Sequence, residues 1–136
     1  MRRRVLEPLG LDAVATTRAA SKALPELAES YNRKDKGFER TNVPAGLDSI
    51  APAGASAGTI EDLTRYLQAH MNKGLVNGRQ ALPAAFFEAM QTPHTPMPAT
   101  GNYSPFTAPQ SYGMGLFLGQ YEGRRMVYHT GTIGGY

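Results

Sequence analysis

Residues 128–136 read Tyr-His-Thr-Gly-Thr-Ile-Gly-Gly-Tyr and place several groups with catalytic chemistry side by side. A strand of this kind beside a nucleophilic serine can offer a backbone N–H to a developing oxyanion and a threonine hydroxyl to the substrate. Its imidazole can polarise or orient a carboxylate. The glycines at 131, 134 and 135 would let a substrate approach the strand edge. On these residues alone, an ordinary strand followed by a glycine turn is the favoured interpretation.

The chain offers no nucleophile in a familiar arrangement. No Ser-x-x-Lys occurs, and Ser21-Lys22 has the wrong spacing because helical neighbours on one face are three or four residues apart. Cysteine is absent, which excludes a thiolate nucleophile, disulfides and Cys-ligated metals.

Neither a metal nor a cofactor is expected. His70 and His94 are far apart in the sequence and lack a carboxylate at ligand spacing. We expect His70 on a helix surface and His94 in a loop. The pattern Gly113-x-Gly115-x-x-x-Gly119 does not open a helix and does not match the dinucleotide fingerprint, so it indicates a glycine-rich strand.

The composition fits one small globular domain. The chain has 136 residues, of which 41% are hydrophobic, and a net charge of +3. Its densest basic cluster, residues 2–4, is more typical of a solvated helix end than of a nucleic-acid site, so no nucleic-acid partner is expected. No apolar run is long enough for a membrane span, and no hydrophobic segment of a signal peptide follows the basic cluster.

Two helices and a third, partial one are predicted around an irregular region. Residues 2–9 read as the last turns of a helix that stops at Gly10, whereas residues 11–58 are irregular apart from a short element of uncertain type near Leu24, Leu27, Ala28 and Tyr31. A helix over 60–73 begins after Thr59, with Glu61 and Asp62 in its first turn, and stops at Gly74. Its apolar residues share one face: Ile60, Leu63, Tyr66, Leu67 and Met71. A second helix runs from Pro83 to about Gln91, with Phe86, Phe87 and Met90 as its buried side.

Strands are predicted towards the end of the chain. Residues 92–111 are proline-rich and read as a loop. Residues 112–118 alternate large and small side chains, as in a strand. Glu122-Gly123 has the composition of a two-residue hairpin turn, from which residues 124–129 would return antiparallel.

Four segments follow one another in an order that is far more specific than any one of them. They are EPLGL at 7–11, APAG at 51–54 leading into TIEDL at 59–63, YGMG at 112–115 and HTGT at 129–132. Together they closely resemble the C-terminal half of the class C β-lactamase-like serine hydrolases, which include D-alanyl-D-alanine carboxypeptidases and related esterases. The resemblance covers essentially the whole chain.

The resemblance implies an α+β fold of the β-lactamase/transpeptidase type, with helices packed on an antiparallel hairpin of a larger sheet. It also implies acyl transfer through a covalent serine ester, on a β-lactam, a D-Ala peptide or an ester. In this family His129 would orient or polarise, Thr130 and Gly131 would contact a small-molecule or peptide substrate, and the Thr132 backbone N–H would lie in the oxyanion hole.

The family's Ser-x-x-Lys and Tyr-x-Asn motifs precede the Pro-Leu-Gly segment, and further strands and a helix follow its Thr-Gly motif. Neither part is present here, so we expect residues 1–136 to be a C-terminal half, truncated at both ends and inactive alone. Such a cut would expose an edge of the strand carrying His-Thr-Gly, through which the chain could self-associate. The alternative is a non-enzymatic truncated or degenerate product, or a module completed by a partner chain.

Two departures from the family pattern leave the substrate open. His129 replaces the lysine of many members, and imidazole is only partly protonated at neutral pH. Phe117 is apolar where a basic residue would help to bind a substrate carboxylate. Residues 30–32, Ser-Tyr-Asn, match a form of the second motif but lie downstream of its place, so we interpret them as structural. The family is often periplasmic or secreted, and the compartment of this chain stays open.

Overall fold

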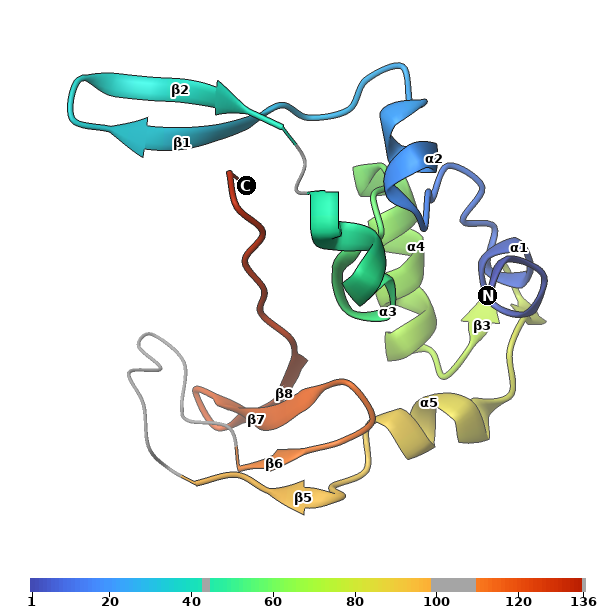
Figure 1. Ribbon diagram of the computed structural model, residues 1–136. Coiled ribbons are helices and arrows are strands. Elements are labelled where there is room, and N and C mark those ends of the chain that lie inside the picture. The colour runs from blue at the N-terminus through green and yellow to red at the C-terminus, as the bar shows by residue number, and fades with distance from the viewer. Residues whose placement is uncertain (43–44, 99–109, 136) are drawn as a thin grey trace. The chain divides into compact units, whose positions relative to one another are not determined.

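The computed structural model describes residues 1–42, 45–98 and 110–135 (Figure 1). The chain divides into two compact units, the first formed by residues 1–65 with 131–136 and the second by residues 66–130. Both contain short helices and antiparallel strands. Within the described residues, no helix is both long and apolar enough to cross a membrane.

The first unit opens with the expected short helix. A 3-10 turn, η1 (Arg2–Arg4), is followed by α1 (Leu6–Leu9), with a break at Val5, where φ is −133°. Gly10 ends α1 with a φ of +67° and donates its N–H to the Glu7 carbonyl at 3.0 Å. This conformation favours glycine, so the predicted helix end is confirmed.

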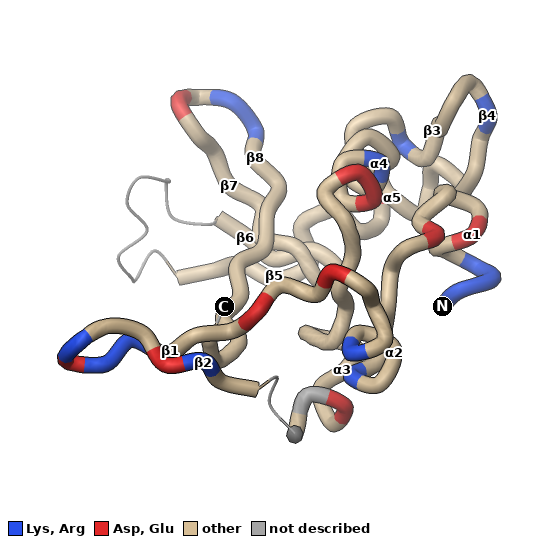
Figure 2. The backbone as a smooth tube through the Cα atoms, turned by 90° about the horizontal axis from the view of Figure 1, so that it is seen from above, with Lys and Arg blue, Asp and Glu red and all other residues tan. Residues whose placement is uncertain are grey.

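The segment predicted to be irregular contains regular structure. Helix α2 (Arg18–Lys22) is capped by Thr17, whose hydroxyl oxygen accepts the Ala20 N–H at 3.1 Å. A 3-10 helix, η2 (Ala45–Ile50), leads directly into α3 (Ala51–Gly54). Strands β1 (Ser30–Lys34) and β2 (Gly37–Thr41) form an antiparallel hairpin. Charges of both signs line this hairpin (Figure 2), so the apolar alternation that marks a strand is missing from it.

Asp62 is buried and charged, and it connects the start of α4 to the segment around Ala13. Its carboxylate accepts the Ala13 N–H at 3.0 Å and pairs with Arg65 at 2.8 Å. Ala15 and Ala57 add a β-bridge close by, with N···O distances of 2.8 and 3.0 Å. The apolar core of this unit is small: Leu6, Leu9, Leu11, Ala15 and Ala55.

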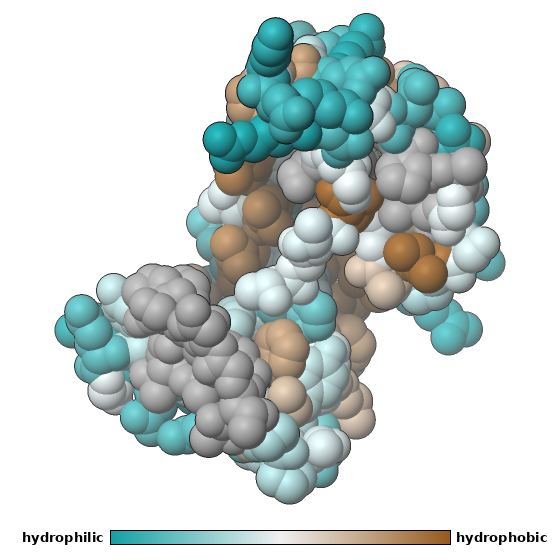
Figure 3. Space-filling view, turned by 60° about the vertical axis from the view of Figure 1, so that its left-hand side comes forward, coloured by the Kyte–Doolittle hydropathy of each residue, from teal (hydrophilic) through white to brown (hydrophobic). Residues whose placement is uncertain are grey.

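Helix α4 (Ile60–Met71) begins where the sequence predicted and ends two residues earlier. The Thr59 hydroxyl oxygen accepts the Asp62 N–H at 3.2 Å, and Gly74, with a φ of +87°, stops the chain from continuing as a helix. The apolar face of α4 is exposed, since the solvent-accessible fractions are 69% at Ile60, 52% at Leu63, 54% at Leu67 and 82% at Met71. Figure 3 shows exposed hydrophobic residues in brown.

The second unit adds a small hairpin and one more helix. Strands β3 (Leu75–Val76) and β4 (Arg79–Gln80) are joined by Asn77 and Gly78, which both have positive φ. Pro83 caps α5 (Ala84–Met90) instead of lying in its first turn. Phe87 is 1% exposed, as predicted, whereas Phe86 is 42% exposed, so its predicted burial is wrong.

The main sheet has the strand order β5-β6-β7-β8, and every pair is antiparallel. Its strands are β5 (Thr95–Pro96), β6 (Ser111–Tyr112), β7 (Phe117–Tyr121) and β8 (Arg124–Tyr128). Glu122 and Gly123 both have positive φ, as a type I′ turn requires, so the predicted hairpin is confirmed.

One predicted strand is in fact two. The chain reverses between Tyr112 and Phe117, which lie opposite each other on β6 and β7. Gly113 donates its N–H to the Leu116 carbonyl at 2.8 Å, and a Cβ on Gly113 would collide with the Met90 carbonyl. The alternation of large and small residues over 112–118 therefore reflects a tight turn packed against the end of α5. The short strand β5 also lies within the predicted loop over 92–111, of which residues 99–109 are outside the described part.

Candidate active site

Strand β8 delivers the His-Thr-Gly motif, residues 129–131, from the edge of the main sheet. In the described part of the chain, β8 pairs with β7 on one side alone. The strand ends at Tyr128, one residue before the predicted end, so the motif follows directly after it. The division between the units falls inside the motif: His129 and Thr130 belong to the second unit, and Gly131 and Thr132 to the first.

His129 is exposed and is held by two aromatic residues of the same sheet. Its Nε2 lies 3.2 Å from the Tyr112 hydroxyl, and its ring is nearly parallel to that of Phe117, with centroids 5.1 Å apart and an interplanar angle of 20°. When the Tyr112 hydroxyl donates to Nε2, the imidazole is neutral and its Nδ1–H is left to donate. These two neighbours therefore orient the ring, and the contact with Tyr112 involves only one of its two nitrogens.

The contact between Tyr112 and His129 was not predicted. It follows from the registers, because Phe117 lies opposite Tyr112 on one side and opposite Tyr128 on the other. Counting back from the Glu122-Gly123 turn would have paired Phe117 with Tyr128. No comparable signal in the sequence fixes the β6–β7 register.

The other predicted site residues are exposed as well. Among the described residues we find no hydrogen bond to the Thr130 hydroxyl or the Thr132 N–H. A Cβ on Gly131 would meet nothing within 4 Å. Gly135 differs, because a Cβ there would lie 2.7 Å from the Cβ of Ser30, and its carbonyl accepts the Tyr31 N–H at 2.8 Å. The packing of the β1–β2 hairpin thus explains the glycine at 135.

Ser21, weighed against the nucleophile motif, and Ser30, weighed against the second motif, both have structural roles. Ser30 is 2% exposed and donates to the Thr41 carbonyl at 2.9 Å, across the β1–β2 pair. Ser21 is 4% exposed and donates to the Thr17 carbonyl at 3.0 Å within α2. Neither hydroxyl is presented to a substrate.

The remaining histidines lie in different surroundings. His94 lies in a loop, as predicted, with Nε2 at 2.9 Å from the Ala89 carbonyl oxygen. His70 is half-buried and not a surface residue, and burial lowers its pKa below the usual 6.5. The described residues include no group of three or more histidine, aspartate or glutamate side chains placed to share a metal ion.

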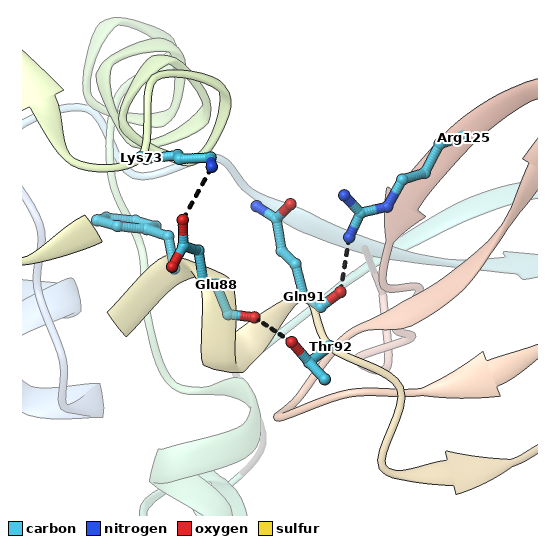
Figure 4. A pocket seen from close by; sticks show the side chains of 6 residues that line it. Lys73, Glu88, Gln91, Thr92 and Arg125 are labelled. Atoms are coloured by element: carbon cyan, nitrogen blue, oxygen red, sulfur yellow. Dashed lines mark hydrogen bonds and ion pairs between the residues drawn. The ribbon is translucent and has the colours of Figure 1, made fainter. Parts of the chain in front are cut away.

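A small pocket of about 170 Å³ opens beside α5 (Figure 4). Its cations are already engaged, since Lys73 pairs with Glu88 at 2.8 Å and Arg125 donates to the Gln91 carbonyl at 2.6 Å. Arg125 precedes His129 by four residues, or about 13 Å along a strand. The pocket is therefore separate from the motif.

Comparison with known proteins shows the family of this chain. The model of the family described as Beta-lactamase matches residues 1–136. The chain belongs to this family. No curated protein matches the chain. Two solved structures show the same fold, and both are distant in sequence.

The octameric penicillin-binding protein homologue from Pyrococcus abyssi superposes with a TM-score of 0.70 at 21% identity, over 93% of this chain and 26% of that one. The D-amino acid amidase from Ochrobactrum anthropi SV3, complexed with L-phenylalanine amide, gives a TM-score of 0.69 at 20% identity, over 98% of this chain and 36% of that one. The β-lactamase-family chain described here thus spans about a quarter to a third of these structures.

Proposed function

We propose that this chain supplies the substrate-binding edge strand of a β-lactamase-family serine hydrolase. In the proposed reaction a serine oxygen attacks the carbonyl carbon of an amide or ester, the amine or alcohol leaves with a proton, and water hydrolyses the serine ester. The Thr132 N–H would stabilise the oxyanion, Thr130 and Gly131 would contact the substrate, and His129 would orient or polarise it. The serine would come from residues outside these 136.

One observation carries the proposal: in a chain of this family, an edge strand ends in an exposed His-Thr-Gly motif. The name of one similar structure, a D-amino acid amidase complexed with an amide, supports an amide carbonyl as the target. The chain lacks Ser-x-x-Lys, so we expect it to be inactive alone.

Acyl-enzyme formation tests this proposal. We expect neither a fluorescent penicillin nor p-nitrophenyl acetate to label residues 1–136 alone. The DNA flanking the coding region should be read in frame for Ser-x-x-Lys and Tyr-x-Asn, and any longer product should be labelled at the serine. Stoichiometric serine labelling of residues 1–136, or an unlabelled longer product that contains both motifs, would refute the proposal.

Two threonines provide a matched pair of variants in such a longer product. Thr130→Val removes a hydroxyl and keeps the shape, so kcat/KM should fall by on the order of tenfold to a hundredfold. Thr132→Val keeps the backbone N–H that we assign to the oxyanion hole, so we expect a much smaller fall. Equal effects at both positions would contradict the proposed roles.

A second candidate, a module completed by another chain, is favoured by the exposed apolar face of α4 and by the β8 edge. Self-association through the edge would pair two copies of β8. Sedimentation should then show a concentration-dependent dimer that Val127→Pro abolishes, because Val127 lies opposite Leu118 in a non-hydrogen-bonded pair and its N–H points to the free edge of β8. A monomer at every concentration would exclude this self-association.

A further inference from the structure

Three aromatic side chains form a row across neighbouring strands of the main sheet. This aromatic row consists of Tyr112 on β6, Phe117 on β7 and Tyr128 on β8, which face one another directly in the register. The ring centroid of Phe117 lies 5.0 Å from that of Tyr112 and 5.4 Å from that of Tyr128. All three are half-buried, so part of their surface is accessible to a ligand.

The aromatic row reaches the motif through His129. The imidazole is stacked on Phe117 and hydrogen-bonded to Tyr112, so it continues the row towards Thr130. An aromatic group that packed on Phe117 would therefore lie on the side of the sheet that leads to Thr130, which we propose contacts the substrate. Aromatic pairs prefer offset or edge-to-face packing, and Tyr112 meets Phe117 edge-on at an interplanar angle of 70°, whereas Tyr128 is tilted by 38° against Phe117.

The charges on β8 do not favour an anion at the row. Side chains alternate between the two faces of a strand, which places Arg125 on the face opposite Tyr128. Arg125 also donates to the Gln91 carbonyl. Arg124 shares the face of Tyr128 but lies four residues, or about 13 Å, away along the strand. A carboxylate on the row would lose water without gaining a cation of β8 in return.

We propose that the aromatic row and His129 form a subsite for a neutral aromatic group of the substrate, and that this subsite does not select a carboxylate. The inference rests on the proposed function, since it names the kind of substrate that the edge strand would accept. Phe117 is then a specificity-determining residue, and the amide or ester would carry an aryl substituent near its reacting carbonyl.

Binding to the full 136-residue chain tests the subsite without any hydrolysis. Phenylacetamide and phenylacetate have the same ring and differ in charge, so they form a matched pair of probes. Proton NMR of the imidazole C2–H signals provides the readout, because the chain has three histidines and two of them, His70 and His94, serve as internal controls. We expect phenylacetamide to shift the His129 signal alone, and phenylacetate to bind no more tightly.

Two variants sharpen the test. Phe117→Leu should weaken phenylacetamide binding about three- to tenfold, since an aromatic contact is worth about 0.5–1.5 kcal/mol. Phe38→Leu changes an aromatic residue that is 76% exposed on β2 and should leave binding unchanged. If Phe117→Leu loses its dispersed spectrum, Phe117→Tyr, which keeps a ring, should retain wild-type affinity.

The subsite is refuted if phenylacetamide leaves the His129 signal unmoved, if it shifts all three histidines alike, or if phenylacetate binds more tightly. Failure here would leave the acyl-enzyme proposal standing, because the serine labelling described above does not depend on an aryl group. Conversely, an absence of labelling would not affect the binding measured in this chain.

Discussion

The second unit contains two histidines that each lie against two aromatic rings, yet their settings differ. His70 on α4 meets Tyr66 and Phe87 edge-on, with ring centroids 4.6 and 4.9 Å apart and interplanar angles of 72° and 85°. His129 stacks on Phe117 at 20° and receives or donates a hydrogen bond at the Tyr112 hydroxyl. Both imidazoles are therefore oriented by their neighbours.

Burial separates the two. The Nε2 of His70 is buried and has no hydrogen-bond partner among the described residues, and its Nδ1 lies 3.3 Å from the Gln91 side-chain nitrogen. Burial disfavours the protonated ring and lowers the pKa of His70. His129 is exposed at the end of an edge strand. Access to solvent, more than contact with aromatic rings, therefore distinguishes a structural imidazole from one that is available for chemistry.

The largest expected effect comes from removing the ring beneath His70. Phe87 is 1% exposed, so Phe87→Ala should lower the free energy of unfolding by about 3–5 kcal/mol. Its neighbour Phe86 is 42% exposed, and Phe86→Ala should cost much less. Urea denaturation followed by circular dichroism compares them, and similar midpoints for both variants would contradict a core centred on Phe87.

Truncating each histidine in turn should produce opposite results in two assays. We expect His70→Ala to lower the free energy of unfolding by about 1–2 kcal/mol, because it opens a gap between packed rings. His129→Ala changes an exposed residue and should stay within about 0.5 kcal/mol of wild type. In the phenylacetamide titration the order should reverse, with His129→Ala weakening binding and His70→Ala leaving it unchanged. If both assays ranked the two variants in the same order, His70 and His129 would not differ in role as we propose.

The smallest expected effect is on the pH dependence of the free energy of unfolding, to which we expect His70 to contribute below pH 6.5. Above about pH 6.5 the ring is neutral in both the folded and unfolded states, so stability does not depend on it. Below pH 6.5 the unfolded chain binds the proton more readily, so the free energy of unfolding falls until the pH passes the lowered pKa of the folded state. His70→Gln should lose this dependence and His94→Gln should keep it. An unchanged slope in His70→Gln would show that another group titrates.

Local signals predicted the elements that depend on a few adjacent residues. Thr59 and Asp62 marked the start of α4, and Glu122-Gly123 marked the β7–β8 turn. The β1–β2 hairpin was missed because its exposed strands carry charges in place of alternating apolar residues. The run over 112–118 was misread because a turn built around Gly113 produces the same alternation as a strand.

The sequence predicted the motif of the candidate site, but it did not predict which residues contact His129. The position of His129 after a strand followed from the sequence, but its contact with Tyr112 depends on a register set by the turn over 113–116. The half-buried state of His70 depends on α5, which places Phe87 and Gln91 against it from 17 and 21 residues away. Such contacts between distant residues leave no periodic trace in the chain.

The clamp formed by Asp62 on Ala13, and by the bridge between Ala15 and Ala57, has a consequence for the evolution of chain length. It holds the two ends of the segment 16–56 close together. The entropy of closing a flexible loop grows only with the logarithm of its length, and each doubling costs about 0.6 kcal/mol. Because α2, the β1–β2 hairpin and the buried Ala55 lie within 16–56, we expect insertions to be inexpensive in the connections between these elements and not inside them, as long as both ends of the clamp are kept.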